Sequence, residues 1–473
     1  MKQLISLFKQ HTGKSKPEIE TLPSSGSNRR YYRLKKDDDS IIGVHGQSRE
    51  ENHAFLELSR HFKKQGLNVP EVFSATDDEI FYIQQDLGDT VLFDKIKAGR
   101  LTGVFSPEEK ALLHKTIAAL ADFQVKGAQD LNFDICYPQP EFNSRSVYWD
   151  LNYFKYNFLK TTEMEFQEDL LENDFDRLAQ NLLQGESETF LYRDFQSRNV
   201  MLVDGEPYFI DYQGGRKGPV YYDVASFLWQ AKANFPNELR DELIQTYISS
   251  LKKHREVDDA EFVKKLRLFV LFRTLQVLGA YGFRGYFEKK PHFIQSIPFA
   301  LKNLRELLND GFDEYPYLTK MLREMTELKQ FADTQKRELT VRVFSFAYKK
   351  GIPNDTSGNG GGYVFDCRAI NNPGKFERYN QYTGLDESVI KFLEDDGEMT
   401  AFLSNIVPLI DSHVKRYIDR DFTDLMISFG CTGGQHRSVY AAQKTAEHIS
   451  KKFGVKVSLT HREQNLEQEF RRR

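Results

Sequence analysis

Residues 191–215 read LYRDFQSRNVMLVDGEPYFIDYQGG, and this stretch decides the fold of the larger part of the chain. Asp194 and Asn199 form a D-x-x-x-x-N sequence directly before one apolar strand, and Asp211 ends the next strand. The VDGE segment between the two strands is a hairpin turn signal, which would return Asp211 to the neighbourhood of Asn199. An isolated pair of this kind is usually a set of loop-capping residues, but the added hairpin and the second carboxylate favour a functional site.

The three residue types suit the transfer of a phosphoryl group. This reaction needs a nucleophile held in line and a phosphate charge neutralised by metal. Asp194 would lie near the attacking hydroxyl, whereas the amide oxygen of Asn199 and the carboxylate of Asp211 would hold the metal and the phosphates. Asp211 follows the strand-ending pair Phe209-Ile210, which would direct it into a cleft.

Length and composition describe a globular protein with more than one domain. The chain has 473 residues, which predicts two or three domains, and 40% of them are hydrophobic and 28% charged. The net charge of −4 argues against a protein that coats nucleic acid or an anionic membrane over its whole surface.

Several features predict a cytoplasmic protein without a membrane segment. The three Cys residues have no paired spacing, which indicates a reducing compartment rather than disulfides or a zinc site. The N-terminus becomes charged too early for a signal peptide. The apolar run 266–283 is interrupted by Arg267, Arg273 and Gln276, so we expect a buried helix and not a membrane span.

Patterns upstream and downstream of the opening stretch predict the architecture. A strand at 40–46, a helix at 49–66 and a strand at 79–89 indicate a small antiparallel lobe with one helix. Ser106, Pro107 and Glu109 predict a capped helix start, and helical patterns fill 150–183 and 219–309.

A second domain is expected after a charged helical connector at 321–338. The period-two run 339–348 reads as a strand, and strand, loop and helix then alternate to the end of the chain. This alternation predicts a separate α/β domain with parallel strands over 339–473.

The first of these regions resembles a known family. The segments YRDFQSRNVML and FIDYQGGRKGPVYYDVASFL, with SSGSNRRYYRL (24–34) and QQDLGD (84–89), are similar to the phosphotransferase family of aminoglycoside, choline and homoserine kinases. Within it they look most like bacterial kinases that phosphorylate N-acetylmuramate and N-acetylglucosamine at the anomeric hydroxyl. The resemblance covers about two-thirds of the chain and implies an α+β, protein-kinase-like bilobal fold over residues 1–320, with ATP and Mg²⁺ as cofactors.

The same resemblance implies roles for individual residues. Asp194 would be the catalytic base, Asn199 and Asp211 the Mg²⁺ ligands, and Asp223 a structural acid that anchors the loop. The residues expected at the nucleotide are Ser27, Arg29, Arg30, Glu51, Gln85 and Asp86, the last two through their backbone. Those expected at the acceptor are Arg198, Trp149 and Tyr153, although packing within a helical lobe explains the two aromatic residues at least as well.

One position departs from the pattern of protein kinases. The strand SIIGVHG offers His45 where those enzymes carry a phosphate-pairing Lys. Arg29 or Arg30 would supply the positive charge instead, with Glu51 as the helix carboxylate that pairs with it. Alternatively, the lobe no longer turns over and the protein is a regulatory binding protein.

A second constellation lies in ISFGCTGGQHRSVYAA (427–442), which reads as a strand, a glycine-containing turn and a helix start. Backbone N–H groups converge in such a turn, and the helix N-terminus adds positive potential, so an anion such as phosphate is expected there. The same letters spell C-x-x-x-x-x-R-S, the signature of cysteine-dependent phosphatases, with Cys431 as nucleophile and Arg437 as clamp. Gly430 replaces the usual His, and the available partner acids are Asp366 and Asp386, so catalysis is the weaker interpretation.

Residues 340–463 also resemble the C-terminal domain of the RNase adapter family RapZ. The matching segments are FSFAYKKGIP, FDCRAINNPG, YTGLDESVIKFL, GCTGGQHRSVY and THRE, in the same order. That family domain senses glucosamine-6-phosphate, binds small RNA and self-associates. The residues that would line an amino-sugar-phosphate pocket are Asp366, Arg368, Cys431, Thr432, Gly433, Gly434, His436 and Arg437.

The two resemblances together predict a small-molecule kinase that is fused to a sugar-phosphate sensor. The expected substrate of the kinase is an amino sugar. The nucleotide-binding domain that precedes the RapZ domain in its own family is absent here, and a kinase stands in its place. The tail FRRR and the Lys451–Lys452 pair read as ordinary solvated charge, so RNA is not favoured as a partner. The remaining alternatives are a regulatory sensor or RNA adapter, and a kinase with a Cys-dependent phosphatase domain.

Overall fold

The structure is a computed structural model of the whole chain, and it describes residues 1–22, 29–185, 187–328, 331, 339–357, 361–419 and 422–470. The chain divides into two compact units, Met1–Ala332 and Asp333–Arg473, each with its own hydrophobic core. We call them unit 1 and unit 2 and describe each by itself.

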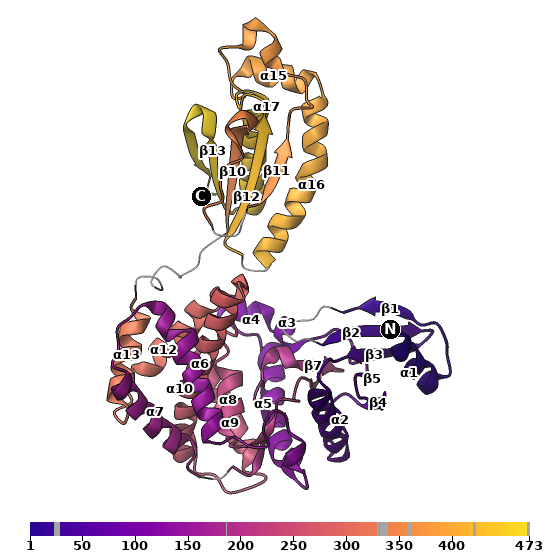
Figure 1. Cartoon of the computed structure of the whole chain (residues 1–473), viewed down its shortest axis with the longest axis vertical. Helices are drawn as coiled ribbons and strands as arrows, with labels where there is room; N and C mark the ends of the chain where they lie inside the picture. Colours follow the sequence, from indigo (N-terminus) through magenta and orange to yellow (C-terminus); the bar gives the residue numbers. More distant parts are fainter. Residues whose placement is uncertain are drawn as a thin grey trace. The chain divides into compact units, whose positions relative to one another are not determined.

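Unit 1 begins with a lobe in which two helices flank a five-stranded antiparallel sheet (Figure 1). The strand order is β1-β2-β3-β5-β4. The elements are α1 (Lys2–Thr12), β1 (Glu18–Thr21), β2 (Arg30–Lys36), β3 (Asp39–His45), α2 (Arg49–Lys64), β4 (Val72–Ala75) and β5 (Phe81–Gln85). Successive side chains of a strand point to opposite faces, so Ile41 of β3 joins the cluster under α1 whereas Ile42 joins the core under α2. The sequence predicted one helix here; the second, α1, covers the outer face with Leu4, Leu7 and Phe8.

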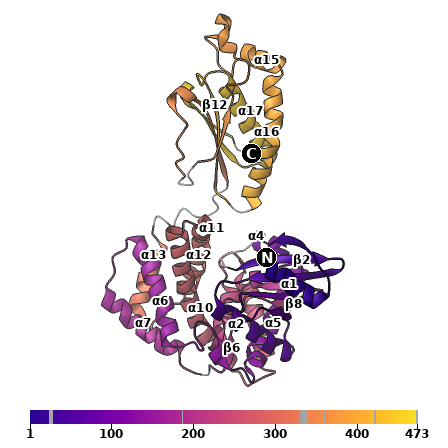
Figure 2. The same ribbon diagram turned by 45° about the vertical axis from the view of Figure 1, so that its right-hand side comes forward.

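The rest of unit 1 is mainly helical (Figures 1 and 2). Its helices are α3 (Leu92–Lys95), α4 (Lys97–Thr102), α5 (Pro107–Ala128), α6 (Ser144–Asn157), α7 (Glu168–Leu182), α8 (Tyr221–Leu228), α9 (Asn237–Leu251), α10 (Asp259–Gly282), α11 (Pro291–Ile294), α12 (Ile297–Leu308) and α13 (Pro316–Thr326). The predicted start of α5 is confirmed, because the side chains of Ser106 and Glu109 each accept a hydrogen bond from the other's backbone N–H.

Helix α10, extended by a π-helical turn over Phe283–Phe287, is long and apolar enough to cross a membrane by length and composition alone. It instead packs against α6, α8 and α12, and Leu266, Val270 and Leu275 on it are buried in the core of unit 1. The sequence prediction of a buried helix over 266–283 agrees with this arrangement.

Two short antiparallel strand pairs frame residues 191–215, which contain Asp194, Asn199 and Asp211. β6 (Thr189–Leu191) pairs with β9 (Arg216–Gly218), and β7 (Val200–Val203) pairs with β8 (Glu206–Phe209). The predicted hairpin turn is Asp204-Gly205, where both residues have the positive φ that such turns require.

The charged segment expected as a connector at 321–338 is partly a core element. Residues 321–326 complete α13, whose Met321, Leu322 and Met325 are buried in the core of unit 1. The spacing of these apolar residues explains the burial, since all three lie on one face of the helix. Residues 329–330 and 332–338 of the expected connector lie outside the described residues.

Unit 2 is an α/β domain with a five-stranded sheet in the order β11-β12-β10-β13-β14. The strands are β10 (Thr340–Ala347), β11 (Tyr363–Asp366), β12 (Asp424–Cys431), β13 (Lys456–His461) and β14 (Leu466–Phe470), and the helices are α15 (Glu387–Asp395), α16 (Glu398–Asp419) and α17 (Arg437–Phe453). The first four strands are parallel, as predicted, and β14 is antiparallel to β13. α17 packs on the sheet and α16 lies along α17 (Figure 2).

Candidate functional site

In unit 1, a buried carboxylate fixes the 192–199 loop. Asp223 accepts hydrogen bonds from the backbone N–H groups of Tyr192 (2.8 Å) and Arg193 (2.9 Å) and from Nε2 of Gln124 (2.8 Å). Arg193 has a φ of 77°, a conformation that costs a non-glycine residue about 1–2 kcal/mol. Burial raises the pKa of Asp223 to about 7, although the three N–H donors oppose the rise. The anchoring role expected for Asp223 matches these contacts.

Asn199 joins the other two predicted residues. Its Nδ2 donates to the backbone oxygen of Asp194 (2.8 Å) and lies 3.4 Å from Oδ2 of Asp211. The backbone N–H of Ile210 also donates to the Asn199 carbonyl (3.1 Å), so the hairpin brings the two segments together as its sequence suggested. Asp211 has a φ of 69°, a strained conformation of the kind that persists at functional sites.

The donor set of Asn199 and Asp211 fits a magnesium ion. Both side chains offer hard oxygen atoms, and among the described residues no hydrogen bond occupies Oδ1 of Asn199. Mg²⁺ is commonly held by one or two protein side chains, with phosphates and water completing its shell. The described residues contain no cluster of three or more His, Cys, Asp or Glu side chains suited to a metal. Asp211 keeps a solvent-exposed edge, yet the surrounding protein removes enough water to raise the pKa of its carboxyl.

Sequence reasoning missed the partner of Asp194. Nη2 of Arg273, on α10, lies 3.5 Å from Oδ1 of Asp194, and the Arg273 side chain is 8% exposed whereas that of Asp194 is 53% exposed. Nε of Arg273 donates to Ser226 Oγ (3.2 Å), which fixes the guanidinium. The signal was present, because Arg273 interrupts an otherwise apolar helix, and a buried Arg needs a partner.

The sequence did not decide whether Arg29 or Arg30 supplies the positive charge at the nucleotide, and the two residues have different surroundings in the structure. Arg29 is 3% exposed and its Nη2 lies 3.1 Å from Oε1 of Glu51 on α2. Arg30 is exposed and pairs across the sheet with His45, whose ring stacks on Phe81. Arg29, the residue directly before β2, therefore forms the ion pair with the carboxylate of α2.

The other expected nucleotide residues have mixed placements. Asp86 is tied by Arg33 (2.7 Å) and Ser40 (2.5 Å), so its side chain is structural and its backbone alone would face a nucleotide. Gln85 ends β5, and its Oε1 accepts a hydrogen bond from the backbone of Glu71. Ser27 lies outside the described residues.

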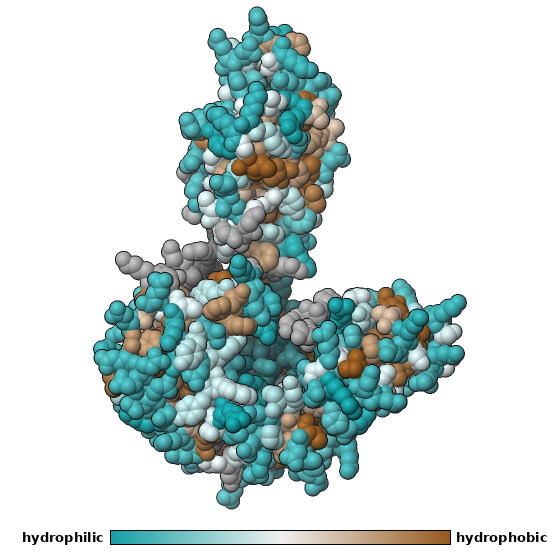
Figure 3. Space-filling view, in the orientation of Figure 1, coloured by the Kyte–Doolittle hydropathy of each residue, from teal (hydrophilic) through white to brown (hydrophobic). Residues whose placement is uncertain are grey.

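Of the three residues expected at the acceptor, only Arg198 belongs to the loop that carries Asp194. Arg198 is an exposed residue of the 192–199 loop, and its guanidinium lies 4.4 Å from the ring centroid of Phe93. Tyr153 packs against Phe283, at a centroid distance of 5.9 Å. Trp149 is 52% exposed, and within the described ranges no ring contact joins it to the loop. Figure 3 shows the surface of unit 1 hollowed between the strand-bearing lobe and the helical lobe, with mostly hydrophilic residues around the hollow.

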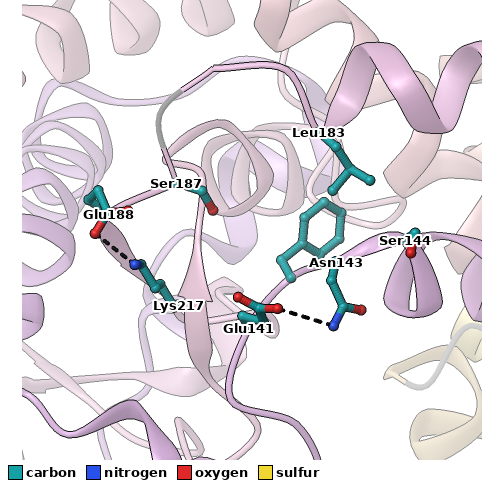
Figure 4. Close-up of a pocket in the computed structure, with 8 residues that line it drawn as sticks. Glu141, Asn143, Ser144, Leu183, Ser187, Glu188 and Lys217 are labelled. Carbon is teal, nitrogen blue, oxygen red and sulfur yellow. Dashed lines mark hydrogen bonds and ion pairs between the residues drawn. The ribbon is translucent and has the colours of Figure 1, made fainter.

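A separate pocket of about 270 Å³ opens elsewhere on unit 1 (Figure 4). Its walls include the ion pair of Lys217 with Glu188 and the contact of Asn143 with Glu141. None of the predicted site residues lines it. We assign the chemistry to the Asp194 region instead, because its residues have the types and order that phosphoryl transfer needs, whereas the polar groups of this pocket are paired with one another.

In unit 2, the carboxyl ends of the parallel strands meet at one edge of the sheet. Asp366 of β11 lies level with Gly430 of β12, and Ala347 of β10 lies level with Cys431. Ligands of open parallel sheets bind at this edge. The turn 432–436 and the N-terminus of α17 follow there, as the sequence predicted.

The turn is held by close backbone approach and by sulfur contacts. Gly434 has a φ of 68°, and a Cβ there would come within 2.3 Å of Glu463 and 2.8 Å of the Ala347 nitrogen. Its N–H donates to Sγ of Cys431 (3.2 Å), which also lies 3.1 Å from Ser438 Oγ. Cys431 is 3% exposed, so its thiol faces the interior of the turn and not the solvent.

Other residues expected at this pocket hold loops together. Nη1 of Arg437 donates to the backbone oxygens of Arg368 (2.9 Å) and Ile370 (2.7 Å), and its Nη2 lies 3.5 Å from Thr432 Oγ1. Nε2 of His436 lies 3.0 Å from the carbonyl of Tyr379. These two side chains are buried, and both contact backbone carbonyls of the neighbouring loop.

The exposed charge at this edge comes from residues 366–368. Asp366 and Arg368 form a two-point ion pair at 2.7 to 3.0 Å, and the guanidinium of Arg368 lies 4.0 Å from the Tyr348 ring centroid. Gly433 has no neighbour within 4 Å of an added Cβ, so the turn is open there. Asp386, one of the acids available to a phosphatase, instead accepts hydrogen bonds from Thr383.

The profile of the phosphotransferase enzyme family matches residues 18–258, just over half of the chain. The chain belongs to this phosphotransferase family. The profile of the RapZ C-terminal domain matches residues 339–465, so this phosphotransferase-family protein carries a RapZ C-terminal domain in unit 2. Both matches confirm the family resemblances of the sequence, and the kinase-like and α/β folds agree with them.

Curated proteins match about a third of the chain. A nucleotide-binding protein of Lactobacillus delbrueckii is 34% identical over 163 residues, covering 34% of this chain and 53% of that protein. One of Endomicrobium trichonymphae is 39% identical over 137 residues, covering 29% and 45%. The chain spans about half the length of the curated relatives it matches.

Solved structures with similar folds are kinases. ADP-bound aminoglycoside phosphotransferase APH(2'')-Ib is 15% identical, covers 66% of this chain and 98% of its own, and has a TM-score of 0.44. Choline kinase from Cryptosporidium parvum is 13% identical, with coverages of 66% and 95% and a TM-score of 0.44. The fold assignment depends on the family matches and the observed topology, because these scores are low.

Replacing Asp223 by Ala tests the anchoring of the 192–199 loop in the phosphotransferase unit. The buried N–H groups of Tyr192 and Arg193 would lose their acceptor, so we expect the free energy of unfolding to fall by about 2–4 kcal/mol. Urea denaturation measures the change, and Asp241→Ala, at an exposed position of α9, is the matched control. Equal stability of the two variants would show that the loop does not need this carboxylate.

Two neighbouring glycines allow a matched test of the turn in the RapZ-type unit. We expect Gly434→Ala to lower the free energy of unfolding by about 1–3 kcal/mol, because it combines a positive φ with a backbone clash. Gly433→Ala, which meets open space, should stay within about 0.5 kcal/mol of wild type. Thermal unfolding of both variants measures the difference, and a reversed order would contradict the described turn.

Proposed function

We propose that the protein is an ATP- and Mg²⁺-dependent kinase that phosphorylates a hydroxyl of an amino sugar, such as N-acetylmuramate or N-acetylglucosamine. The observation that carries the proposal is the contact of Asn199 with both the Asp194 backbone and the Asp211 carboxylate. The amide of Asn199 thus joins the Asp194 loop to the Asp211 carboxylate, and the chain belongs to a family of phosphotransferases, which supports this proposal. The preference for an amino sugar comes from the sequence resemblance described above.

The roles of the residues follow from their surroundings. Asp194, exposed and held by Arg273, would accept the proton of the acceptor hydroxyl at its carboxylate. Asn199 and Asp211 would hold Mg²⁺, which supplies charge neutralisation for the phosphates when bound. Arg29, oriented by Glu51, would face the phosphates of ATP. Arg198 would contact the acceptor or the phosphates from the rim of the loop.

Release of ADP measures the proposed activity. Purified full-length protein is given ATP, Mg²⁺ and in turn N-acetylmuramate, N-acetylglucosamine, choline and an aminoglycoside. We expect acceptor-dependent ADP release with at least one amino sugar, and its loss when Mg²⁺ is chelated. ADP release with choline or the aminoglycoside alone would contradict the acceptor class, and no release with any acceptor would contradict the kinase.

We further propose that unit 2 binds an amino-sugar phosphate at the strand edge. The open turn at Gly433 and the exposed guanidinium of Arg368 support this placement. Calorimetric titration with glucosamine-6-phosphate tests this proposal. Glucosamine, which lacks the phosphate, is the control ligand, and Arg368→Gln is the variant. Unchanged kinase turnover with saturating glucosamine-6-phosphate would remove a regulatory coupling between the units.

Two alternatives have less support. A phosphatase in unit 2 would need an accessible thiolate, whereas Cys431 is buried and its sulfur is bonded within the turn; unchanged sugar-phosphate hydrolysis in Cys431→Ser would exclude it. A catalytically weak sensor was suggested by His45, but Arg29 supplies the missing cation. We place the protein in the cytoplasm, without a membrane partner, and include self-association but not RNA among the interactions of unit 2.

A further inference from the structure

Gln213 lies between two carboxylates from different segments of unit 1, Glu51 and Asp211. Its Nε2 donates a 2.8 Å hydrogen bond to Oδ1 of Asp211 and lies 3.4 Å from Oε1 of Glu51. An amide carries two N–H groups, so one side chain is able to donate to both carboxylates. Gln213 is 8% exposed, and its own Oε1 is buried without a hydrogen-bond partner among the described residues. A buried unsatisfied oxygen costs stability, which argues for a role beyond packing.

The contact belongs to a continuous seam along one face of α2. Glu51, Phe55 and Ser59 are spaced by four residues and therefore share a face. Tyr212 stacks on Phe55 at a centroid distance of 5.3 Å, and its hydroxyl lies 2.6 Å from Ser59 Oγ. Gln213 completes the seam at Glu51. The segment that carries Asp211 is thus tied to α2 by three successive contacts.

Each end of the Gln213 bridge meets a residue of the proposed nucleotide site. Glu51 Oε1 also receives Arg29 at 3.1 Å, and Asp211 Oδ2 also meets Asn199 at 3.4 Å. The geometry points to Gln213 as a positioning residue that fixes Asp211 relative to the Arg29–Glu51 pair. The proposed metal-binding carboxylate and the phosphate-facing cation are thereby held in one arrangement. This inference rests on the proposed function.

An exchange of the amide for a carboxylate tests the bridge with little change in shape. In Gln213→Glu, the new carboxyl lies beside Glu51 and Asp211. Ionised, it donates no hydrogen bond and adds a third negative charge; protonated, it donates to only one of the two carboxylates, so both forms lose the double bridge. Gln213→Met removes the donor without adding charge, which covers the case in which the glutamate variant does not fold. Gln184→Glu, at an exposed position after α7, makes the same chemical change away from the site.

Binding of ADP to the full-length protein is measured by calorimetry with Mg²⁺ and with EDTA. We expect the Kd for ADP in Mg²⁺ to rise about tenfold in Gln213→Glu, the effect of losing one hydrogen bond to a charged group. Gln213→Met should show a smaller rise, and Gln184→Glu none. In Gln213→Met, the KM for the acceptor and the thermal midpoint without ligand should stay near wild type, which separates positioning from a general loss of structure.

A double-mutant cycle supplies the second readout. Because Arg29 and Gln213 share Glu51, the effects of Arg29→Met and Gln213→Met on ADP binding should be less than additive. Full additivity, or wild-type Mg²⁺–ADP binding by both Gln213 variants, would overturn the inference and leave the kinase standing. Intact Mg²⁺–ADP binding without phosphorylation of any acceptor would instead contradict the proposed function alone, and a wild-type protein that does not bind ADP would contradict both.

Discussion

Asp194→Asn should reduce the kcat of acceptor-dependent ADP release by about 10²- to 10⁴-fold, the range expected when a general base is removed. The amide keeps the shape of the side chain but takes up no proton at neutral pH. KM for ATP should change little, because the proposed metal ligands, Asn199 and Asp211, remain. Steady-state kinetics over a range of acceptor and ATP concentrations separate the two parameters.

The hairpin offers a matched control for this variant. Asp204→Asn makes the same change at an exposed residue with a φ of 51°, a conformation that Asn accepts readily. It should leave kcat unchanged. If Asp194→Asn kept wild-type turnover while folding normally, Asp194 would not be the base.

Arg29→Met should lower kcat/KM for ATP by about 10²-fold, as expected for removal of one preorganised charged donor at phosphate. Arg29 is buried, its guanidinium is fixed by Glu51, and it lies 5.6 Å from the Phe55 ring centroid. Methionine retains much of the apolar volume, so most of the effect should come from the charge.

Arg30→Met is the natural comparison, because Arg30 is the next residue along the chain and is exposed, whereas Arg29 is buried. Its kcat/KM for ATP should stay within a factor of about two of wild type, an effect below 0.5 kcal/mol. Thermal unfolding of both variants accounts for any loss of folded protein. A larger effect at Arg30 than at Arg29 would reverse the assignment of the phosphate-facing cation.

The sequence predicted the parts of the site that depend on local chain geometry. The spacing of Asp194, Asn199 and Asp211 and the hairpin between them require only a turn and two short strands, and the structure brings their backbones and side chains into contact. The carboxyl-end placement of the 432–436 turn follows in the same way from parallel strands.

The remaining partners depend on distant segments and could not be read from spacing. Arg273 reaches Asp194 across 79 positions, and Gln213 reaches Glu51 across 162. The choice between Arg29 and Arg30 needed the packing of α2, because Arg29 pairs with Glu51 at a distance of 22 positions along the chain. The helix at 321–326 was mistaken for a connector because its charged face is as prominent in the sequence as its buried one.

The identity of the cation opposite Glu51 has a consequence for chemical labelling. Acyl-phosphate derivatives of nucleotides mark many kinases by acylating an amine beside the bound phosphates. A guanidinium stays protonated and is not acylated under the same conditions, so the Arg29–Glu51 pair gives such reagents no target at this position. Such a reagent should therefore leave residue 29 without an acyl group even when it occupies the nucleotide site.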